Sequence, residues 1–317
     1  MPSSAHVSYA DRLVAAAVPL VPKPLVERLA TPYLGGSTLE QALVVVEGLR
    51  RDGLSSTVDI VGEGVTRPAV AASNAGQYLT TLDEIAARTL PAHVSVKPSG
   101  VGSRLSNLLA QEQLERIVER AEATGSFVRI DMEDSTAADP TLHMYERLVE
   151  AGHDRVGIVL QARLWRTASD VARLAHLRPN VRLCKGIYLE TPAVAMQDAE
   201  AIRSSFIALL EQLLLGGSYV GIATHDEDLI VRALRLVRSL GVPPDGYEFQ
   251  MLLGVRPDLA RLLAREHLVR VYVPYGSDSL AYAQRRFREN PQIAGYVARD
   301  IARALTKAIR LMPAPPD

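Results

Sequence analysis

The sequence predicts an α/β fold of the (β/α)8 class, a TIM-type barrel. Eight short runs rich in β-branched residues alternate with longer stretches in which apolar residues recur every three or four positions. This alternation is typical of parallel strands joined by outer helices. Eight strands can close into a barrel without leaving an edge, and a length of 317 residues suits one such barrel with added segments.

The predicted strands follow one another along most of the chain. In order they are 56–62 (STVDIVG), 93–98 (HVSVKP), 127–133 (FVRIDME), 156–163 (VGIVLQAR), 180–186 (NVRLCKG), 219–226 (YVGIATHD), 247–253 (YEFQMLL) and 269–276 (VRVYVPYG). An open doubly wound sheet is the alternative, but the Gly-x-Gly-x-x-Gly turn of that fold does not follow the first strand. The closed barrel is therefore the prediction.

The stretches between the strands predict helices that return the chain to the start of the next strand. Residues 105–125 and 226–241 carry apolar side chains at helical spacing and end at glycine. Residues 1–50, which include a helical pattern over 38–53, are predicted to form a helical segment packed on the barrel. Residues 51–317 would form the barrel domain itself, with its last helix over the mouth of the barrel.

Composition and charge narrow the classes of function. Acidic and basic residues nearly cancel, at 36 against 35, so no global field would attract nucleic acid or an anionic membrane. The single cysteine, Cys184, excludes an internal disulfide and favours a reducing compartment, the cytoplasm. The apolar run within residues 1–24 follows Asp11 and Arg12 and is interrupted by prolines. Neither a signal peptide nor a membrane anchor is expected.

Polar residues concentrate at the predicted carboxyl ends of the strands, which form the active-site face of such a barrel. They are Lys97, Asp131, Glu133, Asp134, Gln161, Arg163, Arg182, Lys185, Thr224, His225, Asp226 and Gln250. So many polar groups at buried positions indicate a functional site. Two also have structural interpretations, because Lys97 could pair with Asp131 and Gln161 could satisfy a loop backbone.

Neither a metal site nor a hydrolytic triad is expected at these strand ends. His225 stands beside Asp226, but His143, His153 and His176 fall in predicted helices or at their ends, so no set of three ligands assembles. No nucleophile elbow is present to support a Ser-His-Asp arrangement.

The segment YAQRRFRENP, residues 282–291, carries a concentrated polar face. At about 100° per residue in a helix, Tyr282, Arg285, Arg286 and Glu289 project from one side. One interpretation is a solvated face held by Glu–Arg pairs. The helix directly follows strand eight, however, and so begins beside the barrel mouth. Two guanidiniums and a tyrosine at that place would bind a small carboxylate.

Taken in order, these motifs resemble the proline dehydrogenase family, flavoenzymes that include the proline-oxidising domain of bifunctional proline utilisation proteins. The matching stretches cover nearly all of the barrel and are SVKPSGVG, RIDMEDS, GIVLQARL, VRLCKGIYLE, ATHDE, EFQMLLGV, YVPYG and YAQRRFREN. Each is weak alone, whereas the ordered set ending in Tyr-x-x-Arg-Arg-x-x-Glu-Asn is specific.

The resemblance implies oxidation of L-proline to 1-pyrroline-5-carboxylate by hydride transfer to FAD. Asp131 and Arg182 would be the catalytic residues beside the reacting atoms, with Arg182 close to flavin N5. The implied substrate-binding residues, with Glu289 orienting the arginines, are Lys97, Tyr282, Arg285 and Arg286. The implied FAD-binding residues are Met132, Gln161, Arg182, Lys185, Gly186, Ile187, Thr224, His225 and Arg288.

The resemblance also implies partners for the protein, although the sequence departs from the family pattern at a few positions. Reduced FAD would pass its electrons to a quinone during transient contact with the inner face of the membrane, and 1-pyrroline-5-carboxylate dehydrogenase is a further implied partner. Because the chain ends soon after the barrel, a monofunctional enzyme is expected. The sequence departs from the family pattern at Pro98, Arg163 and Leu189, where relatives often carry an aliphatic residue, an aromatic residue and tryptophan, respectively.

Two other functions fit the same barrel. Lys97 or Lys185 could form a Schiff base in a lyase or aldolase, if burial beside another cation activates the amine. A non-catalytic barrel could also bind a small carboxylate, since fold alone does not settle function.

Overall fold

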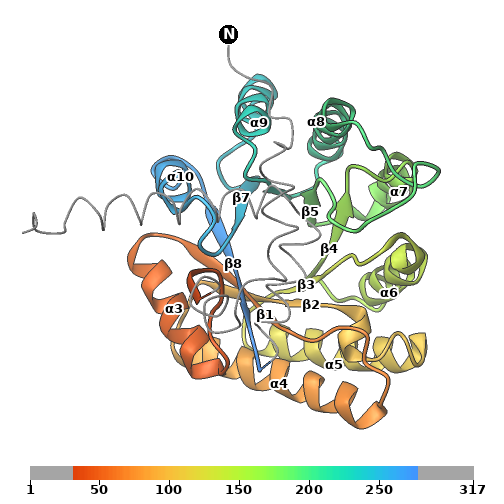
Figure 1. Ribbon diagram of the computed structural model, residues 1–317, viewed down its shortest axis with the longest axis vertical. Helices are drawn as coiled ribbons and strands as arrows, with labels where there is room; N and C mark the ends of the chain where they lie inside the picture. The colour runs from red at the N-terminus through yellow and green to blue at the C-terminus, as the bar shows by residue number, and fades with distance from the viewer. Residues whose placement is uncertain (1–30, 278–317) are drawn as a thin grey trace, which may run out of the picture.

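The structure, a computed structural model, describes residues 31–277 and contains a closed barrel of eight parallel strands (Figure 1). The strands lie around the barrel in chain order. They are β1 (Ser55–Ile60), β2 (Ala92–Val96), β3 (Val128–Ile130), β4 (Val156–Gln161), β5 (Val181–Cys184), β6 (Val220–Ala223), β7 (Tyr247–Leu252) and β8 (Val269–Tyr275). Each overlaps one predicted run, so the predicted fold class is confirmed.

Closure of the sheet rests on pairing between its first and last strands. Val58 of β1 lies opposite Val94 of β2 on one side and opposite Val273 of β8 on the other. None of the eight described strands is left as an edge. The alternative of an open doubly wound sheet is therefore wrong.

Helices form an outer ring around the strands (Figure 1). They are α3 (Leu39–Arg51), α4 (Pro68–Ala87), α5 (Asn107–Ala123), α6 (Ala138–Glu150), α7 (Thr167–Leu174), α8 (Ala199–Leu215), α9 (Glu227–Ser239) and α10 (Pro257–Leu263). Short 3-10 helices lie in the connections: η2 (Thr31–Tyr33), η3 (Pro98–Val101), η4 (Ser135–Ala137) and η5 (Ala175–Leu177). This ring covers the outer side of the sheet, as parallel strands require.

Local sequence sets the ends of the two helices that the pattern predicted most clearly. The side chain of Ser106 accepts a hydrogen bond from the backbone of α5, and Asp226 does the same for α9. Gly125 and Gly241, just beyond the last turns, have φ angles of 67° and 63°. Both helices therefore begin at a capping side chain and are followed by a glycine in the left-handed region.

Helix α3 packs against β1 and β8 on the outside of the barrel. Its residues Ala42, Leu43 and Val46 are buried in the core cluster. The sequence predicted this helix, whereas the domain boundary near residue 50 stays a prediction. The helix expected after strand eight, which would lie over the barrel mouth, falls outside the described residues.

Alternate residues of each strand face opposite sides of the sheet, and the two sides differ in chemistry. The outward side is aliphatic: Val58, Val94 and Ile130 are fully buried in a cluster with helix residues such as Leu82 and Leu114. The inward side is polar, with buried or half-buried Thr57, Asp59, Ser95, Arg129, Asp131, Arg182, Glu248, Gln250, Arg270 and Tyr272. Charged groups therefore meet inside the barrel.

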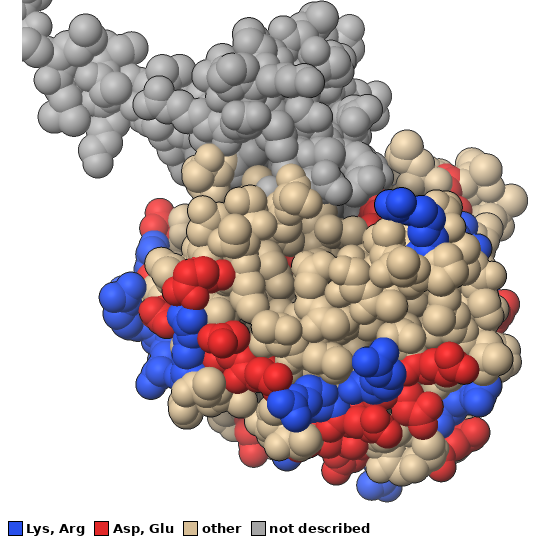
Figure 2. Space-filling model, turned by 90° about the horizontal axis from the view of Figure 1, so that it is seen from below, with Lys and Arg blue, Asp and Glu red and all other residues tan. Residues whose placement is uncertain are grey.

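The described outer surface mixes acidic and basic side chains. On the face shown in Figure 2, Lys and Arg are interspersed with Asp and Glu. Pairs such as Arg88 with Glu40 and Arg166 with Asp139 join neighbouring elements of the outer ring. Within residues 31–277, every helix is too short or too polar to traverse a lipid bilayer.

Candidate active site

A cavity of about 240 Å³ lies at the carboxyl ends of the strands. Every predicted site residue that the structure describes lines it, namely Lys97, Asp131, Met132, Gln161, Arg182, Lys185, Gly186, Ile187, Thr224 and His225. The other predicted site residues lie outside the described residues: Tyr282, Arg285, Arg286, Arg288 and Glu289. Residues from the ends of five strands, β2 to β6, therefore meet at one place.

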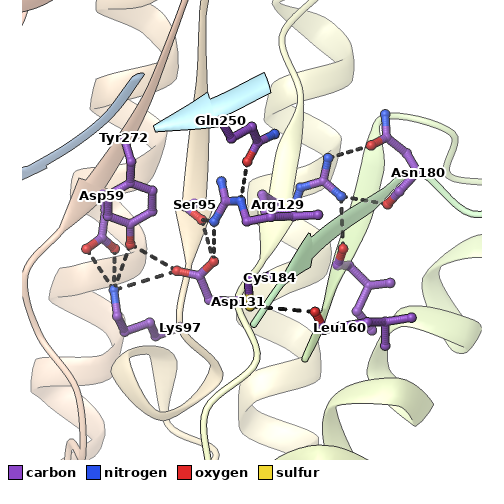
Figure 3. Close-up of polar contacts among 12 residues, drawn as sticks. Asp59, Ser95, Lys97, Arg129, Asp131, Leu160, Asn180, Cys184, Gln250 and Tyr272 are labelled. Carbon is purple, nitrogen blue, oxygen red and sulfur yellow. Dashed lines mark hydrogen bonds and ion pairs between the residues drawn. The ribbon is translucent and has the colours of Figure 1, made fainter. Parts of the chain in front are cut away.

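Asp131 and Arg182 form an ion pair at the floor of the cavity. Arg182 Nη1 donates to Asp131 Oδ1 at 2.7 Å. Ser95 Oγ donates to the same oxygen at 2.8 Å, and Figure 3 shows Ser95 beside Asp131. The Tyr272 hydroxyl donates to Asp131 Oδ2 at 3.0 Å, and its ring lies 5.2 Å from the Arg182 guanidinium carbon. Both oxygens of Asp131 are thus occupied by donors, which fixes the carboxylate and the guanidinium relative to one another.

Lys97 pairs mainly with Asp59, a residue that the sequence analysis missed. Lys97 Nζ lies 2.7 Å from each carboxylate oxygen of Asp59 but 3.7 Å from the nearer oxygen of Asp131 (Figure 3). The structural pairing of Lys97 with Asp131 is therefore weaker than its pairing with Asp59. The signal was an acidic residue inside the apolar β1 run, where a buried carboxylate requires a partner.

The two carboxylates beside Lys97 have opposite pKa shifts. Burial raises the pKa of Asp59 above its ordinary value, against the opposing charge of Lys97. Burial acts in the same direction on Asp131, but the charges of Arg182 and Lys97 and the hydrogen bonds from Ser95 and Tyr272 outweigh it and lower its pKa. Asp131 is therefore the carboxylate held firmly as an anion.

Gln161 presents a buried polar atom that the described residues do not satisfy. Its Nε2 donates to the Glu133 carbonyl oxygen at 2.7 Å, which orients the amide, while its buried Oε1 has no hydrogen-bond partner among residues 31–277. Gly186, with a φ of 99°, brings its backbone so close that a Cβ would lie 2.7 Å from this oxygen. Gln161 thus satisfies a loop carbonyl with one atom and leaves the other as an acceptor.

Lys185 adds positive charge at the side of the cavity. Its Nζ lies 2.9 Å from Asp226 Oδ2, and Arg203 Nε donates to the same oxygen at 2.8 Å. These two cations outweigh burial and lower the pKa of Asp226. Lys185 therefore brings one positively charged group to the cavity, and Asp226 holds it in place.

His225 is a neutral side chain with a defined tautomer. Burial, with the nearby charges of Lys185 and Arg256, lowers its pKa to about 3. Its Nε2 accepts the Leu252 backbone N–H at 2.9 Å, so Nδ1 carries the proton. In the described part of the chain, no group of His, Cys, Asp and Glu has the arrangement of a metal site.

Three strand-end residues do not line the cavity. Glu133 accepts hydrogen bonds from the backbone N and the Oγ of Ser99, which ties η3 to β3. Asp134 caps η4, and Arg163 donates to the carbonyl oxygen of Tyr188. A residue that directly follows a strand therefore need not line the cavity, because its side chain can turn toward a neighbouring loop instead.

The donor and acceptor set fits the isoalloxazine of FAD, which has one ring N–H group and two ring carbonyl groups. The free Gln161 Oε1 can accept from the N–H, while Arg182 and Lys185 supply donors and positive charge. Gly186 allows a flat ligand to approach the backbone, since it adds no side chain there.

We expect Cys184 to be unreactive although it lines the cavity. Burial raises the pKa of its thiol to about 11, and Sγ donates to the Leu160 carbonyl oxygen at 3.6 Å (Figure 3). Because the thiolate is the reactive form, iodoacetamide should label the folded protein at pH 8 far more slowly than the urea-unfolded protein. Mass spectrometry measures both rates, and equal rates would contradict the expected burial.

Comparisons of the sequence with known proteins agree with one another. A model of the family described as proline dehydrogenase matches residues 42–299. Proline dehydrogenase of Deinococcus radiodurans is 39% identical over 274 residues, which cover 85% of this chain and 88% of that protein. Proline dehydrogenase 1 of Bacillus subtilis strain 168 is 37% identical over 273 residues, which cover 86% of this chain and 90% of that protein.

Solved structures resemble the barrel at lower sequence identity. The crystal structure of proline utilization A from Bdellovibrio bacteriovorus, inactivated by N-propargylglycine, has a TM-score of 0.78 and 22% identity with this chain. The match covers 83% of this chain and 32% of that longer chain. At this identity, the likeness bears on the fold alone.

Proposed function

The chain belongs to the proline dehydrogenase family, and we propose that it oxidises L-proline to 1-pyrroline-5-carboxylate with FAD as the hydride acceptor. The observation that carries this function is that the fixed Asp131–Arg182 pair and the free Gln161 Oε1 belong to one cavity at the strand ends. A charged pair and an unsatisfied acceptor on rigid strands suit a bound ring whose charge changes during the reaction.

Substrate binding requires cations beyond those at the cavity floor. Lys97 and Arg182 are balanced there by Asp59 and Asp131, so the described pairs offer hydrogen bonds but no net charge for an added carboxylate. Arg285 and Arg286 would supply that charge, with Lys97 donating to the same carboxylate. In this proposal Tyr282 packs on the pyrrolidine ring and Glu289 orients the arginines.

Oxidation of the secondary amine removes a hydride from the ring carbon beside nitrogen, and FAD supplies the acceptor that no side chain can provide. Asp131 and Arg182 would hold the reacting groups, and Arg182 and Lys185 would stabilise negative charge on the reduced ring. The remaining proposed contacts to FAD come from Met132, Gln161, Gly186, Ile187, Thr224, His225 and Arg288.

Family membership also supports a proposal for the electron acceptor and the location of the enzyme. We propose that a quinone takes the electrons, during transient contact between a cytoplasmic enzyme and the inner face of the membrane. Contact with 1-pyrroline-5-carboxylate dehydrogenase would remove the product. The proposed catalytic unit is the barrel domain, residues 51–317, with the segment 1–50 packed on it.

The purified protein should be yellow, and L-proline should bleach it in the absence of oxygen, because the proposed reaction transfers a hydride to FAD. Absorbance spectra before and after proline addition measure this change, and D-proline is the matched control for a chiral site. A folded protein that takes up no FAD would exclude the proposed function.

The Schiff-base lyase predicts a different result in the same sample. Both candidate lysines are ion-paired, Lys97 with Asp59 and Lys185 with Asp226, and a charged amine is a poor nucleophile. Borohydride treatment with substrate should therefore leave both lysines unmodified. A reduced adduct on either one would favour the lyase.

A further inference from the structure

Arg182 uses two of its three nitrogens to bind the protein. Nη1 donates to Asp131 and Ser95, while Nε donates to Gln250 Oε1 at 2.5 Å. No described residue accepts a hydrogen bond from Nη2, although Arg182 lines the cavity. The contacts at Nε and Nη1 therefore determine the plane of the guanidinium and leave one nitrogen available to a ligand.

The amide of Gln250 is held in one orientation by charged groups below it. Gln250 Nε2 donates to Glu248 Oε1 at 2.6 Å, and Arg270 Nε donates to the same oxygen at 2.8 Å. Arg270 is itself anchored through Nη1 to the Ser56 carbonyl oxygen at 2.9 Å. An ionised carboxylate only accepts and a guanidinium only donates, so a flipped Gln250 amide would create two repulsive contacts.

Glu248 remains an acceptor because of its surroundings. Burial tends to raise its pKa, but the charge and hydrogen bond of Arg270 and the hydrogen bond from Gln250 outweigh that effect and lower it. Arg270 and Glu248 also balance one another in charge. They therefore orient the Gln250 amide without adding net charge to the cavity.

The Gln250 amide lies against the neighbouring strand, β6, at a position where only a glycine leaves enough room for it. Gly221 of β6 lies beside Arg182 of β5 in the sheet register. A Cβ at Gly221 would overlap Gln250 Nε2 and lie 2.8 Å from its Cδ. Gln250 of β7 therefore reaches past β6 to Arg182 of β5, through space that a larger residue at position 221 would occupy.

We propose that Gln250, held by Glu248 and Arg270, is a positioning residue that sets the orientation of the Arg182 guanidinium toward the bound flavin and substrate. This role rests on the proposed function. Gln250 acts through Arg182, and its loss should leave the carboxylate-binding groups at the mouth unchanged. The predicted consequence is a slower reduction of the flavin with little change in the affinity for proline.

A double-mutant cycle tests this role. Gln250→Met keeps the length of the side chain but removes the acceptor for Arg182, so it should slow flavin reduction by proline about tenfold or more. In an Arg182→Met background, the same change should alter the rate by less than about twofold, since Gln250 then has no guanidinium to orient. Stopped-flow absorbance at saturating proline measures all four rates.

The flavin midpoint potential gives a second readout of the same cycle. Gln250→Met should shift the potential in the direction of the Arg182→Met shift, and add no shift in the double variant. Equal effects of Gln250→Met in both backgrounds, in rate or in potential, would overturn the positioning role. Those results would place Gln250 in direct contact with the ligand or in a general structural role.

Two further variants serve as a control and as an independent test of the role of Gln250. Gln113→Met makes the same chemical change at a buried glutamine of α5 that pairs with Arg116, and it should leave reduction unchanged. Gly221→Ala displaces the Gln250 amide without deleting a polar group, and it should slow reduction as Gln250→Met does. A wild-type rate in folded, flavin-loaded Gly221→Ala protein would contradict the proposed role even if Gln250→Met fails to fold.

Failure of this inference differs from failure of the proposed function. If proline does not reduce the flavin of the wild-type protein, the proposed function is wrong. If wild-type flavin is reduced and the cycle is additive, the function stands and only the role of Gln250 is wrong. Flavin content and thermal unfolding, measured for each variant, separate both results from loss of the cofactor or of the fold.

Discussion

Replacing Asp131 with asparagine should slow reduction of the bound flavin by proline about 100-fold, the cost of a misplacement near 1 Å at a reacting centre. The carboxylate holds Arg182 Nη1 at 2.7 Å and the Tyr272 hydroxyl at 3.0 Å. Asparagine keeps the shape of the side chain but cannot accept from both partners with two charged oxygens. Stopped-flow absorbance at saturating proline measures the rate.

The same substitution distinguishes the effect of lost geometry from the effect of lost negative charge at Asp131. Removing a buried anion leaves the site more positive, which by itself should stabilise a reduced, negatively charged flavin. A slower reduction at an unchanged or higher midpoint potential therefore identifies lost geometry as the cause. Asp154→Asn, which makes the same change at a side chain that is 87% exposed, is the control and should behave as wild type.

Stability will fall as well, because Asp131 belongs to a buried ion pair. Removing one partner of such a pair costs about 3 to 5 kcal/mol in typical cases. Thermal unfolding and flavin content must therefore accompany the kinetic measurement. A wild-type rate of reduction in flavin-loaded Asp131→Asn protein would exclude a role beside the reacting atoms.

Changing Arg285 or Arg286 to methionine should lower the affinity for a proline-like carboxylate by about tenfold or more per residue, roughly the value of a hydrogen bond to a charged group. The cations at the cavity floor are already balanced by Asp59 and Asp131, so an added carboxylate depends on charge from elsewhere. Methionine keeps much of the length and helix propensity of arginine but removes its charge and planar donors.

Titration of the flavin spectrum with an unreactive cyclic carboxylate measures this affinity without catalysis. Lysine at either position should restore only part of it, because a point charge cannot make two parallel hydrogen bonds. Arg235→Met, at an exposed position of α9, is the matched control. The alternative of a solvated helix face predicts at most the ~0.2 to 1 kcal/mol of an exposed ion pair, and unchanged affinity in both variants would support it.

The strands and their order could be predicted from the sequence because their signals are local. Eight β-branched runs such as residues 56–62 and 269–276 correspond to β1 and β8, and alternation with helical stretches leads to a parallel sheet. The rule that the carboxyl ends of barrel strands share one face then placed Lys97, Asp131 and Arg182 in one cavity.

The pairing of side chains inside the barrel depended on tertiary structure. Lys97 meets Asp59 across 38 residues of sequence, and Arg182 meets Gln250 across 68. Local patterns cannot choose among several charged residues that all point into the same barrel, because the choice depends on the register and closure of the sheet. The sequence identified Gln250 as a polar residue at a strand end. Its contact with Arg182, through Oε1 of the amide, became visible only in the folded barrel.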